Sequence, residues 1–177
     1  MPIRTSPVAA FAGVEPIVLP AQVPYRRQDQ DMWCWAACCQ MLLGYFGRPE
    51  VSQCDMAGDK FNRSCCAEPL EDGCNQGCFP EDAYDRYGIQ VGEAVPGTSA
   101  ADLDDALSAG RPVEVYYVWD DGGAHVALVV GREADGKYQV HDSFHGKGPR
   151  SFRRINRGYG LGRLDSSYLN IAIKGVQ

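Results

Sequence analysis

The most informative segment of the chain is Gln28-Asp29-Gln30-Asp31-Met32-Trp33-Cys34-Trp35-Ala36-Ala37-Cys38-Cys39-Gln40-Met41-Leu42-Leu43-Gly44-Tyr45-Phe46-Gly47. Between residues 32 and 46 the only strongly polar side chain is Gln40, and alanine, methionine and leucine are good helix formers. The run therefore predicts a helix, with Asp31 as its N-cap and Gly47 at its end. Because this helix is apolar on every side, we expect it to be buried all round at the centre of the domain.

Cys34 falls in the first turn of the predicted helix. Unpaired backbone N–H groups and the positive end of the helix dipole favour an anion there, so they stabilise a thiolate. A catalytic nucleophile is therefore one interpretation of Cys34. The other is a small buried apolar residue, because cysteine is among the most buried residue types. Both interpretations fit the segment taken alone.

The bulk composition is that of one acidic domain. The chain has 177 residues and a net charge of −6, and five of its eleven prolines lie in residues 1–24. We predict an extended arm or leader over residues 1–22, without the apolar core of a secretory signal, and one domain over residues 23–177. The negative charge gives no electrostatic footprint for nucleic acid or anionic lipid, and no apolar run reaches the ~18 residues of a membrane span. We expect neither partner, and we expect a monomer.

The cysteines cluster in the first half of the chain. Eight of them lie at positions 34, 38, 39, 54, 65, 66, 74 and 78. This usage is typical of disulfides and indicates an oxidising destination. With Cys34 kept for chemistry seven remain, so at most three disulfides form within the domain and one thiol stays free.

Residues 60–80 are predicted to be an irregular loop held by cross-links. Four cysteines lie near enough in sequence to close short loops, although the adjacent pair is not expected to bond to itself: Cys54, Cys65, Cys66 and Cys74. Cys38 is a candidate to bridge from the helix to this loop. A zinc site using the spacing between Cys74 and Cys78 is the alternative, and we favour disulfides over it. We therefore expect no metal and no other cofactor.

Helical patterns fill the first half of the chain and strand patterns fill the second. Besides the central helix, helical segments are expected at residues 50–59 with Ser52 near the cap, at 80–87, and at 99–109 with Ser99 as the cap. Strands are expected at residues 112–119, 125–131, 137–142, 150–155 and 168–173. Helices followed by an antiparallel sheet predict an α+β fold.

A catalytic cysteine needs a base, and the base needs an orienting group. His125 opens an apolar strand directly after two glycines, so its ring should face a cleft. Asp142 ends the next strand, and a hairpin would place it beside His125, where it can fix the tautomer. The plainer alternatives are a histidine packed at a sheet edge and an aspartate that begins a turn. His141 should point to the opposite face and His145 lies in the following loop, so both are poorer base candidates.

Gln28 lies in the loop that leads into the predicted helix. Its amide N–H and the backbone N–H of Cys34 are the expected donors to the oxyanion that forms when the sulfur attacks a carbonyl. Gln30 is the competing candidate for the side-chain donor. Two aspartates in this loop oppose a thiolate, so an imidazolium at His125 must supply much of the stabilisation.

Three blocks of the sequence resemble the papain-like cysteine proteases: Gln28 with Met32-Trp33-Cys34-Trp35-Ala36-Ala37, then Gly123-Ala124-His125-Val126, then Val140-His141-Asp142. The bacterial branch is the most similar, with its effector proteases of plant pathogens and its leader-cleaving peptidases of bacteriocin export. Residues 107–113 and the cysteine segments at 51–54, 65–66 and 74–75 fit as well, so the resemblance covers roughly residues 23–173. It implies a papain-like fold, a helical lobe packed on an antiparallel sheet lobe. It also implies Cys34 as nucleophile, His125 as base, Asp142 as orienting residue and Gln28 as oxyanion donor.

The function implied is that of a cysteine endopeptidase that acts on a protein or peptide through a thioester intermediate. The same triad also serves deamidation and acyl transfer to an amine, which is one alternative. A non-catalytic, cysteine-rich binding module is another. Asp142 stands where plant papain has asparagine, and Ser143 follows it where the export peptidases commonly have proline. Secretion or translocation out of a bacterial cell is the expected destination, and the shorter chain implies reduced substrate-binding loops.

Overall fold

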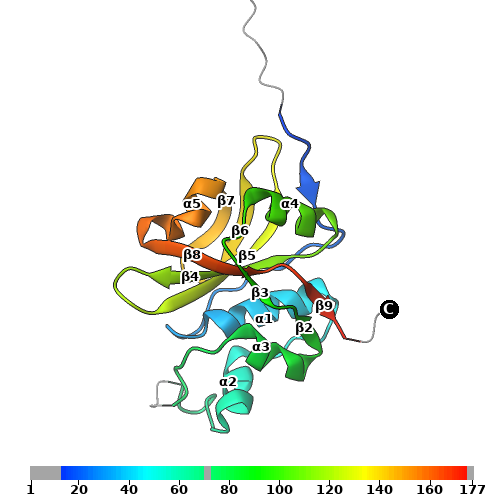
Figure 1. The fold of residues 1–177 in the computed structure, drawn as a ribbon. Coiled ribbons are helices and arrows are strands. Elements are labelled where there is room, and N and C mark those ends of the chain that lie inside the picture. The colour runs from blue at the N-terminus through cyan, green and yellow to red at the C-terminus, as the bar shows by residue number, and fades with distance from the viewer. Residues whose placement is uncertain (1–12, 70–72, 175–177) are drawn as a thin grey trace, which may run out of the picture.

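The structure, a computed structural model, describes residues 13–69 and 73–174, so residues 1–12 of the expected arm lie outside the described part. Its centre is α1 (Cys34–Tyr45), which lies between an antiparallel sheet on one side and α2 (Gln53–Phe61) and α3 (Pro80–Ala83) on the other (Figure 1). Every residue of α1 from Trp35 to Leu43 is buried. The predicted mixture of helices and antiparallel sheet, with a buried central helix, is confirmed.

Within the described residues, seven strands form one antiparallel sheet in the order β3-β8-β4-β5-β6-β7, and β1 pairs with the end of β5. A small second sheet joins β2 and β9. The predicted strands at 112–119, 125–131 and 137–142 correspond to β4, β5 and β6. The strand bounds are β1 (Ile17–Val18), β2 (Ile89–Val91), β3 (Ala94–Pro96), β4 (Val113–Trp119), β5 (Ala124–Arg132), β6 (Tyr138–Asp142), β7 (Gly146–Arg150), β8 (Gly162–Tyr168) and β9 (Ile171–Ile173).

The central helix begins later than predicted. Its first residue is Cys34, and its N-cap is Trp33 with no capping side chain, so Asp31 as N-cap was wrong. The reason is a turn ahead of the helix, in which the Trp33 N–H donates to the Gln30 carbonyl at 3.1 Å. The predicted end is confirmed, because Gly47 is left-handed with φ 63°.

The shorter helices follow their predicted caps. The Ser52 hydroxyl accepts from the Asp55 N–H at the start of α2, and Ser99 forms a capping box with Asp102 at the start of α4 (Ala100–Ser108). The segment at 80–87 forms α3 followed by the short 3-10 helix η1 (Tyr84–Tyr87). Both α4 and α5 (Phe152–Asn156) lie on the side of the sheet away from α1 (Figure 1).

Two strand predictions near the end of the chain need correction. Residues 150–155 are not a strand, because the Ser151 hydroxyl caps α5 by accepting from the Arg154 N–H. Residues 168–173 are not one strand but the end of β8 and then β9, which belong to different sheets. A 3-10 turn, η2 (Gly158–Gly160), separates α5 from β8. In the described residues, no helix has the length and apolar character needed to cross a membrane.

Two disulfides cross-link the loop that follows α2. They join Cys54 to Cys66 and Cys65 to Cys74, as expected for short loops without a bond between neighbours. The alternative zinc site is wrong, since Cys74 is in a disulfide. The predicted bridge from Cys38 is wrong too, because its thiol is buried against the sheet and lies 3.8 Å from the Val126 carbonyl oxygen.

Candidate active site

The helical side and the sheet contribute opposite walls of one pocket. Cys34 is the first residue of α1, and its thiol is only half-buried, whereas His125 lies near the start of β5 and is 6% exposed. Both line a pocket of about 210 Å³, together with Phe79, Tyr116 and Val126. The fold thus brings together a sulfur and an imidazole that lie far apart in sequence.

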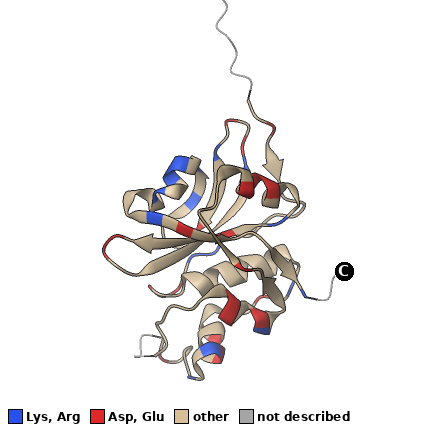
Figure 2. Cartoon of the chain, viewed as in Figure 1, with Lys and Arg blue, Asp and Glu red and all other residues tan. Residues whose placement is uncertain are grey.

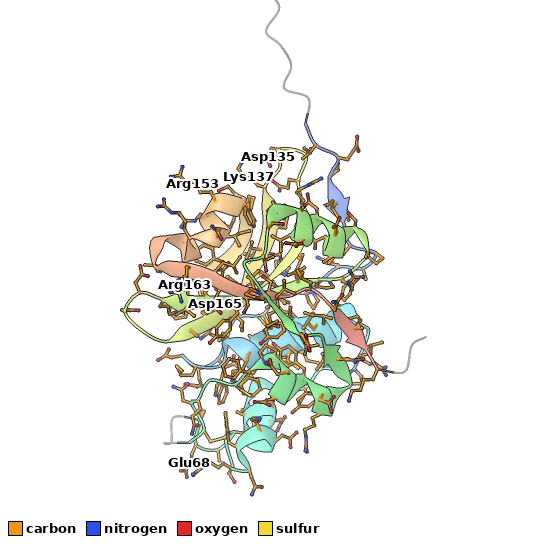
Figure 3. All side chains as sticks on the ribbon, in the orientation of Figure 1. Glu68, Asp135, Lys137, Arg153, Arg163 and Asp165 are labelled. Atoms are coloured by element: carbon orange, nitrogen blue, oxygen red, sulfur yellow. A yellow bond between two sulfur atoms is a disulfide. The ribbon has the colours of Figure 1, made fainter. Side chains whose placement is uncertain are left out.

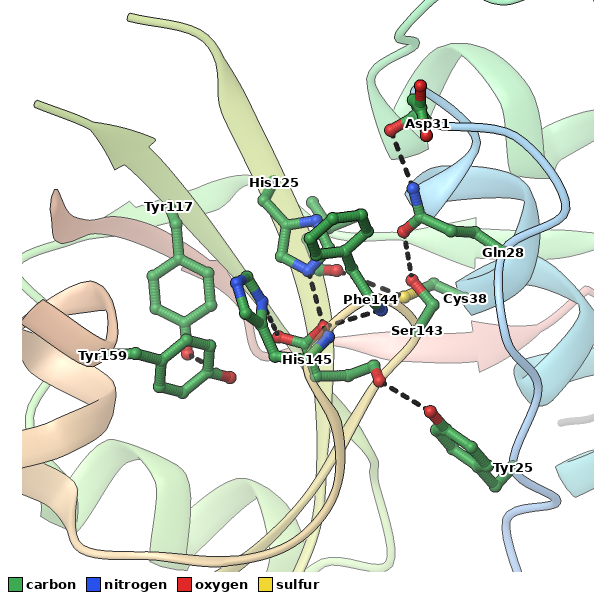
Figure 4. Close-up of polar contacts among 12 residues, drawn as sticks. Tyr25, Gln28, Asp31, Cys38, Tyr117, His125, Ser143, Phe144, His145 and Tyr159 are labelled. Atoms are coloured by element: carbon green, nitrogen blue, oxygen red, sulfur yellow. Dashed lines mark hydrogen bonds and ion pairs between the residues drawn. The ribbon is translucent and has the colours of Figure 1, made fainter. Parts of the chain in front are cut away.

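The His125 imidazole is held by the carboxylate of Asp142. Its Nε2–H donates to Asp142 Oδ1 at 2.9 Å (Figure 4). Burial lowers the pKa of His125, but the hydrogen bond to Asp142 and the nearby Cys34 sulfur outweigh burial and raise that pKa from 6.5 to about 9. Burial raises the pKa of Asp142, but the hydrogen bond from His125 outweighs it and lowers the pKa to about 2. At neutral pH the pair is therefore an imidazolium and a carboxylate.

Asp142 also organises the loop that follows β6. Its Oδ1 accepts the backbone N–H groups of Phe144 at 2.9 Å and His145 at 2.7 Å, and its Oδ2 lies 3.3 Å from His145 Nδ1 (Figure 4). His125, Asp142 and His145 offer donor atoms within 4.8 Å of one another, a spacing that suits a metal ion. Each imidazole nitrogen that faces the carboxylate is already hydrogen-bonded to it. The hydrogen bonds between Asp142 and the two rings therefore account for this cluster without a metal ion.

Aromatic rings cover the imidazole on its outer side. Trp119 stacks on His125 with ring centres 5.7 Å apart, and Tyr117 stacks on Trp119 at 5.5 Å. Tyr117 pairs with His125 across the β4–β5 ladder, and side chains two apart on a strand share a face. The sequence reasoning missed Trp119 as part of the site. Its signal was the alternation of aromatic residues in β4 opposite the histidine strand.

Gln28 lies in the loop ahead of α1, and both the nitrogen and the oxygen of its side-chain amide are hydrogen-bonded. Its Nε2 donates to the Gln30 carbonyl at 3.0 Å. The same Nε2 donates to the Asp31 carbonyl at 2.7 Å, and Oε1 accepts the Ser143 hydroxyl at 2.8 Å (Figure 4). Both amide protons are thus engaged by the loop backbone. Gln30 contributes its carbonyl to this arrangement, and its side chain makes no hydrogen bond within the described residues.

The disulfide-held loop secures the start of α1. Trp33 Nε1 donates to the Cys74 carbonyl at 2.8 Å, and Trp35 Nε1 donates to the Gln76 carbonyl at 3.0 Å. The Met32 N–H donates to the Asn75 side chain at 2.9 Å. The cysteine-rich loop is therefore a clamp on the residues that flank Cys34.

The buried carboxyl group of Glu114, on β4, is linked to α1 through the Tyr84 hydroxyl. The Tyr84 hydroxyl lies 3.0 Å from the Trp35 carbonyl and 2.8 Å from Glu114 Oε2, yet it carries a single proton. Both contacts are hydrogen bonds when Tyr84 donates to Trp35 and a protonated Glu114 donates to Tyr84. Burial raises the pKa of Glu114 well above its usual range, in agreement with that assignment.

The third histidine lies away from the site. His141 packs edge-on against Tyr25 with ring centres 5.6 Å apart, in a hollow near β1 that contains neither Cys34 nor His125. Burial lowers the pKa of His141 to about 4, so the ring is neutral at physiological pH. The prediction that it faces away from His125 agrees with this position.

A buried helix that begins at a half-exposed cysteine, packed on a sheet that carries a histidine–aspartate pair, is the papain-like arrangement. The chain superposes on a solved structure from a study of antibody cross-reactivity between the mite allergens Blo t 1 and Der p 1. The TM-score is 0.53 at 15% identity, over 93% of this chain and 74% of that chain, which shows the fold.

The family model described as papain-like cysteine protease AvrRpt2 matches residues 18–156, so the chain belongs to this family of cysteine protease hydrolases. No curated protein shows significant similarity to the chain. The predicted resemblance and fold class are confirmed, and a protease implies a protein substrate.

Proposed function

We propose that the chain is a cysteine endopeptidase that uses Cys34, His125 and Asp142 as its triad. The observation that carries this proposal is the position of the His125 imidazole. One nitrogen is hydrogen-bonded to Asp142 at 2.9 Å, and the ring lines the same pocket as Cys34. That is the order of groups needed to activate a sulfur and to hold the resulting imidazolium.

The reaction proceeds through an acyl-enzyme. The Cys34 sulfur bonds to the peptide carbonyl carbon, and the C–N bond then breaks while His125 gives its proton to the leaving amine. A water molecule attacks the thioester, His125 takes one of its protons, and the carboxylic acid leaves as the sulfur regains its original state. Asp142 keeps one tautomer and orientation of the ring throughout.

Two donors face the developing oxyanion in this proposal. The Cys34 backbone N–H begins α1 and donates to no group within the described residues, and the Gln28 amide is the second donor. Because both Gln28 amide protons donate to loop carbonyls in the free protein, the oxyanion has to replace one carbonyl as acceptor. Losing one such donor costs about 100- to 1,000-fold in kcat.

We also propose that the protein acts outside the cell that makes it, as a secreted or translocated bacterial effector and as a monomer. Its two disulfides support an oxidising destination. Residues 1–22 as an arm or leader and residues 23–177 as the protease domain complete this proposal. Intact-mass measurement of the exported protein tests it, and a fully reduced mass would contradict the oxidising destination.

The proposal predicts one reactive thiol. At pH 6, iodoacetamide should label Cys34 first, because burial raises the pKa of Cys38, Cys39 and Cys78. His125→Ala should slow this labelling strongly. Peptide mapping by mass spectrometry locates the label, and preferential labelling of another cysteine would remove the basis of the triad.

Activity of matched variants completes the test. Cys34→Ala should abolish peptide cleavage without lowering Tm, Gln28→Ala should lower kcat by about 100-fold or more, and Cys39→Ala on the same helix should keep its activity. Cleavage and ammonia release are measured together on a peptide library. Ammonia release without chain cleavage would favour a deamidase, and retained cleavage by Cys34→Ala would require another nucleophile.

A further inference from the structure

Four arginines gather on one surface of this acidic chain. A hollow of about 820 Å³ is lined by Arg153, Arg154, Arg157 and Arg163, and we call it the arginine hollow. Figure 2 shows the basic residues gathered on α5 and on the start of β8. This surface contrasts with the net charge of −6 of the whole chain. The positive charge is therefore local, and the net charge of the chain does not reveal it.

Most of these arginines have no charged partner within the described part of the fold, and Arg154 lies over the Tyr159 ring, 5.6 Å from its centre. The buried residue of α5 is Ile155, which packs into the core, and the neighbouring arginines face outward. Among the described residues, Arg153, Arg154 and Arg157 have no carboxylate within 4.0 Å, while Arg163 lies 3.6 Å from Asp165. Arg153 and Arg163 are labelled in Figure 3. Several guanidinium groups are thus left with their hydrogen-bond donors available.

The arginine hollow adjoins the proposed catalytic cleft. Asp120 and Gly160 line both the hollow and a neighbouring cleft of about 570 Å³. That cleft is also lined by Gln28, His125 and His145, but not by Cys34. A peptide leaving the site on the imidazole side therefore runs toward the arginines.

Reaction chemistry determines which part of the substrate takes that path. The leaving amine receives its proton from His125, so the residues that follow the scissile bond lie on the imidazole side. The acyl part stays bonded to Cys34, beside the apolar pocket that contains Phe79 and Tyr116. The cleft with His145 and Gln28 therefore holds the residues downstream of the bond.

We propose that the arginine hollow binds acidic side chains of the substrate located a few residues after the scissile bond. This inference rests on the proposed endopeptidase function and adds the class of sequence that it selects. Guanidinium groups match carboxylates through paired hydrogen bonds, and attraction between opposite charges also speeds encounter. A peptide fits better than an extended anionic surface, because the basic site is concave and joins the cleft, while the rest of the chain is acidic.

The test uses a peptide library scanned by position, with Asp and Glu compared with Asn and Gln at each residue after the scissile bond. Wild-type protein should cleave the acidic peptides with a kcat/KM about tenfold higher, because exposed ion pairs contribute modestly and several act together. The preference should shrink as salt is raised. The variant R153Q/R154Q/R157Q should lose it while cleaving neutral peptides at the wild-type rate. Arg48→Gln, an exposed arginine beyond the far end of α1, is the matched control and should keep the preference.

Each outcome bears on one proposal. Equal turnover of acidic and neutral peptides by the wild type, or an acid preference that survives in the triple variant, overturns the inference and leaves the endopeptidase function intact. Failure to cleave any peptide counts against the proposed function. In that case, fluorescence anisotropy with Cys34→Ala and labelled acidic peptides still tests the hollow, and absence of arginine-dependent binding overturns the inference. Phosphatidylserine vesicles that bind the wild type but not the triple variant, without any acid preference, would overturn it in favour of a lipid surface.

Discussion

Cys34 and His125 come from two parts of the molecule that are held in place differently. On the helical side, the segment around Cys34 is secured by side-chain contacts from a cross-linked loop, with Trp33 and Trp35 bonded to the carbonyls of Cys74 and Gln76. On the sheet side, His125 and Asp142 are carried by β5 and β6, which are paired by backbone hydrogen bonds.

This difference predicts which changes should disturb the helical side and which should disturb the sheet side. A strand ladder is maintained by backbone groups and is insensitive to redox conditions, so the imidazole and carboxylate should keep their geometry in reducing solution. The clamp depends on the bond between Cys65 and Cys74, so the position of the sulfur should depend on oxidation. Three changes test this contrast, beginning with the largest effect.

Asp142→Asn breaks the sheet side. An amide oxygen still accepts the Nε2–H, as the asparagine of plant papain does, but it carries no charge to balance the imidazolium, so kcat/KM should fall by about 10- to 1,000-fold, in step with a loss of about 1–3 pKa units. The alkaline limb of the pH–rate profile should also move down from near pH 9, because the His125 pKa loses the main contribution that raises it. Steady-state kinetics measured from pH 5 to 10 report both effects, because this range covers the titration of the His125 imidazole.

The same pair should make stability depend on pH in a defined direction. Because the pKa of His125 is raised from 6.5 to about 9 and that of Asp142 is lowered from 3.8 to about 2, the pair stabilises the fold fully between pH 3.8 and pH 6.5, and this stabilisation is lost as pH rises through 9. Urea unfolding should show that decline in wild-type protein and a smaller one in Asp142→Asn. An equal decline in both proteins would contradict the charged pair.

Removing the clamp disulfide should affect the helical side. The double variant C65S/C74S should lose about 2–3 kcal/mol of unfolding free energy, as expected for a short loop, and part of its activity. Hydrogen exchange should quicken for the indole N–H groups of Trp33 and Trp35 and remain slow in β4 to β6. Faster hydrogen exchange at the two indoles alone indicates local loosening, whereas faster exchange in β4 to β6 as well indicates global unfolding.

The matched control is the other disulfide. C54S/C66S should lose stability by a similar amount but retain more activity, because Trp33 and Trp35 bond to Cys74 and Gln76 and not to the loop between Cys54 and Cys66. Equal activity losses in the two double variants would show that the clamp has no particular link to Cys34.

The smallest effect is expected where the two sides are joined, at Glu114. Glu114→Gln keeps a donor for Tyr84 and should change the unfolding free energy little, whereas Glu114→Leu leaves the Tyr84 hydroxyl oxygen without a donor and should cost about 1–3 kcal/mol. Infrared spectroscopy at neutral pH should show a protonated-carboxyl band that Glu114→Gln lacks. An ionised carboxylate in the wild type would refute the assigned proton.

Local patterns predicted most of what lies next to the site. The apolar run through α1, the capping serines of α2 and α4, and the alternating strands β4 to β6 follow from side chains close in sequence. The strand β8 was missed because it reads as polar, yet Ser166 and Ser167 are buried where β8 pairs with β3 and β4. Its burial comes from neighbouring strands, which local periodicity does not contain.

The sequence by itself determined that a cysteine lies in the first turn of a buried helix, that a histidine begins one strand and that an aspartate ends the next, because these features depend on local hydrophobic spacing and turn residues. Only the tertiary structure decided which groups surround them. The tryptophan over the imidazole, the engagement of both Gln28 amide protons and the arginine hollow beside the cleft all join residues far apart in the chain. Such contacts depend on how helix and sheet pack against each other, and no local pattern encodes that geometry.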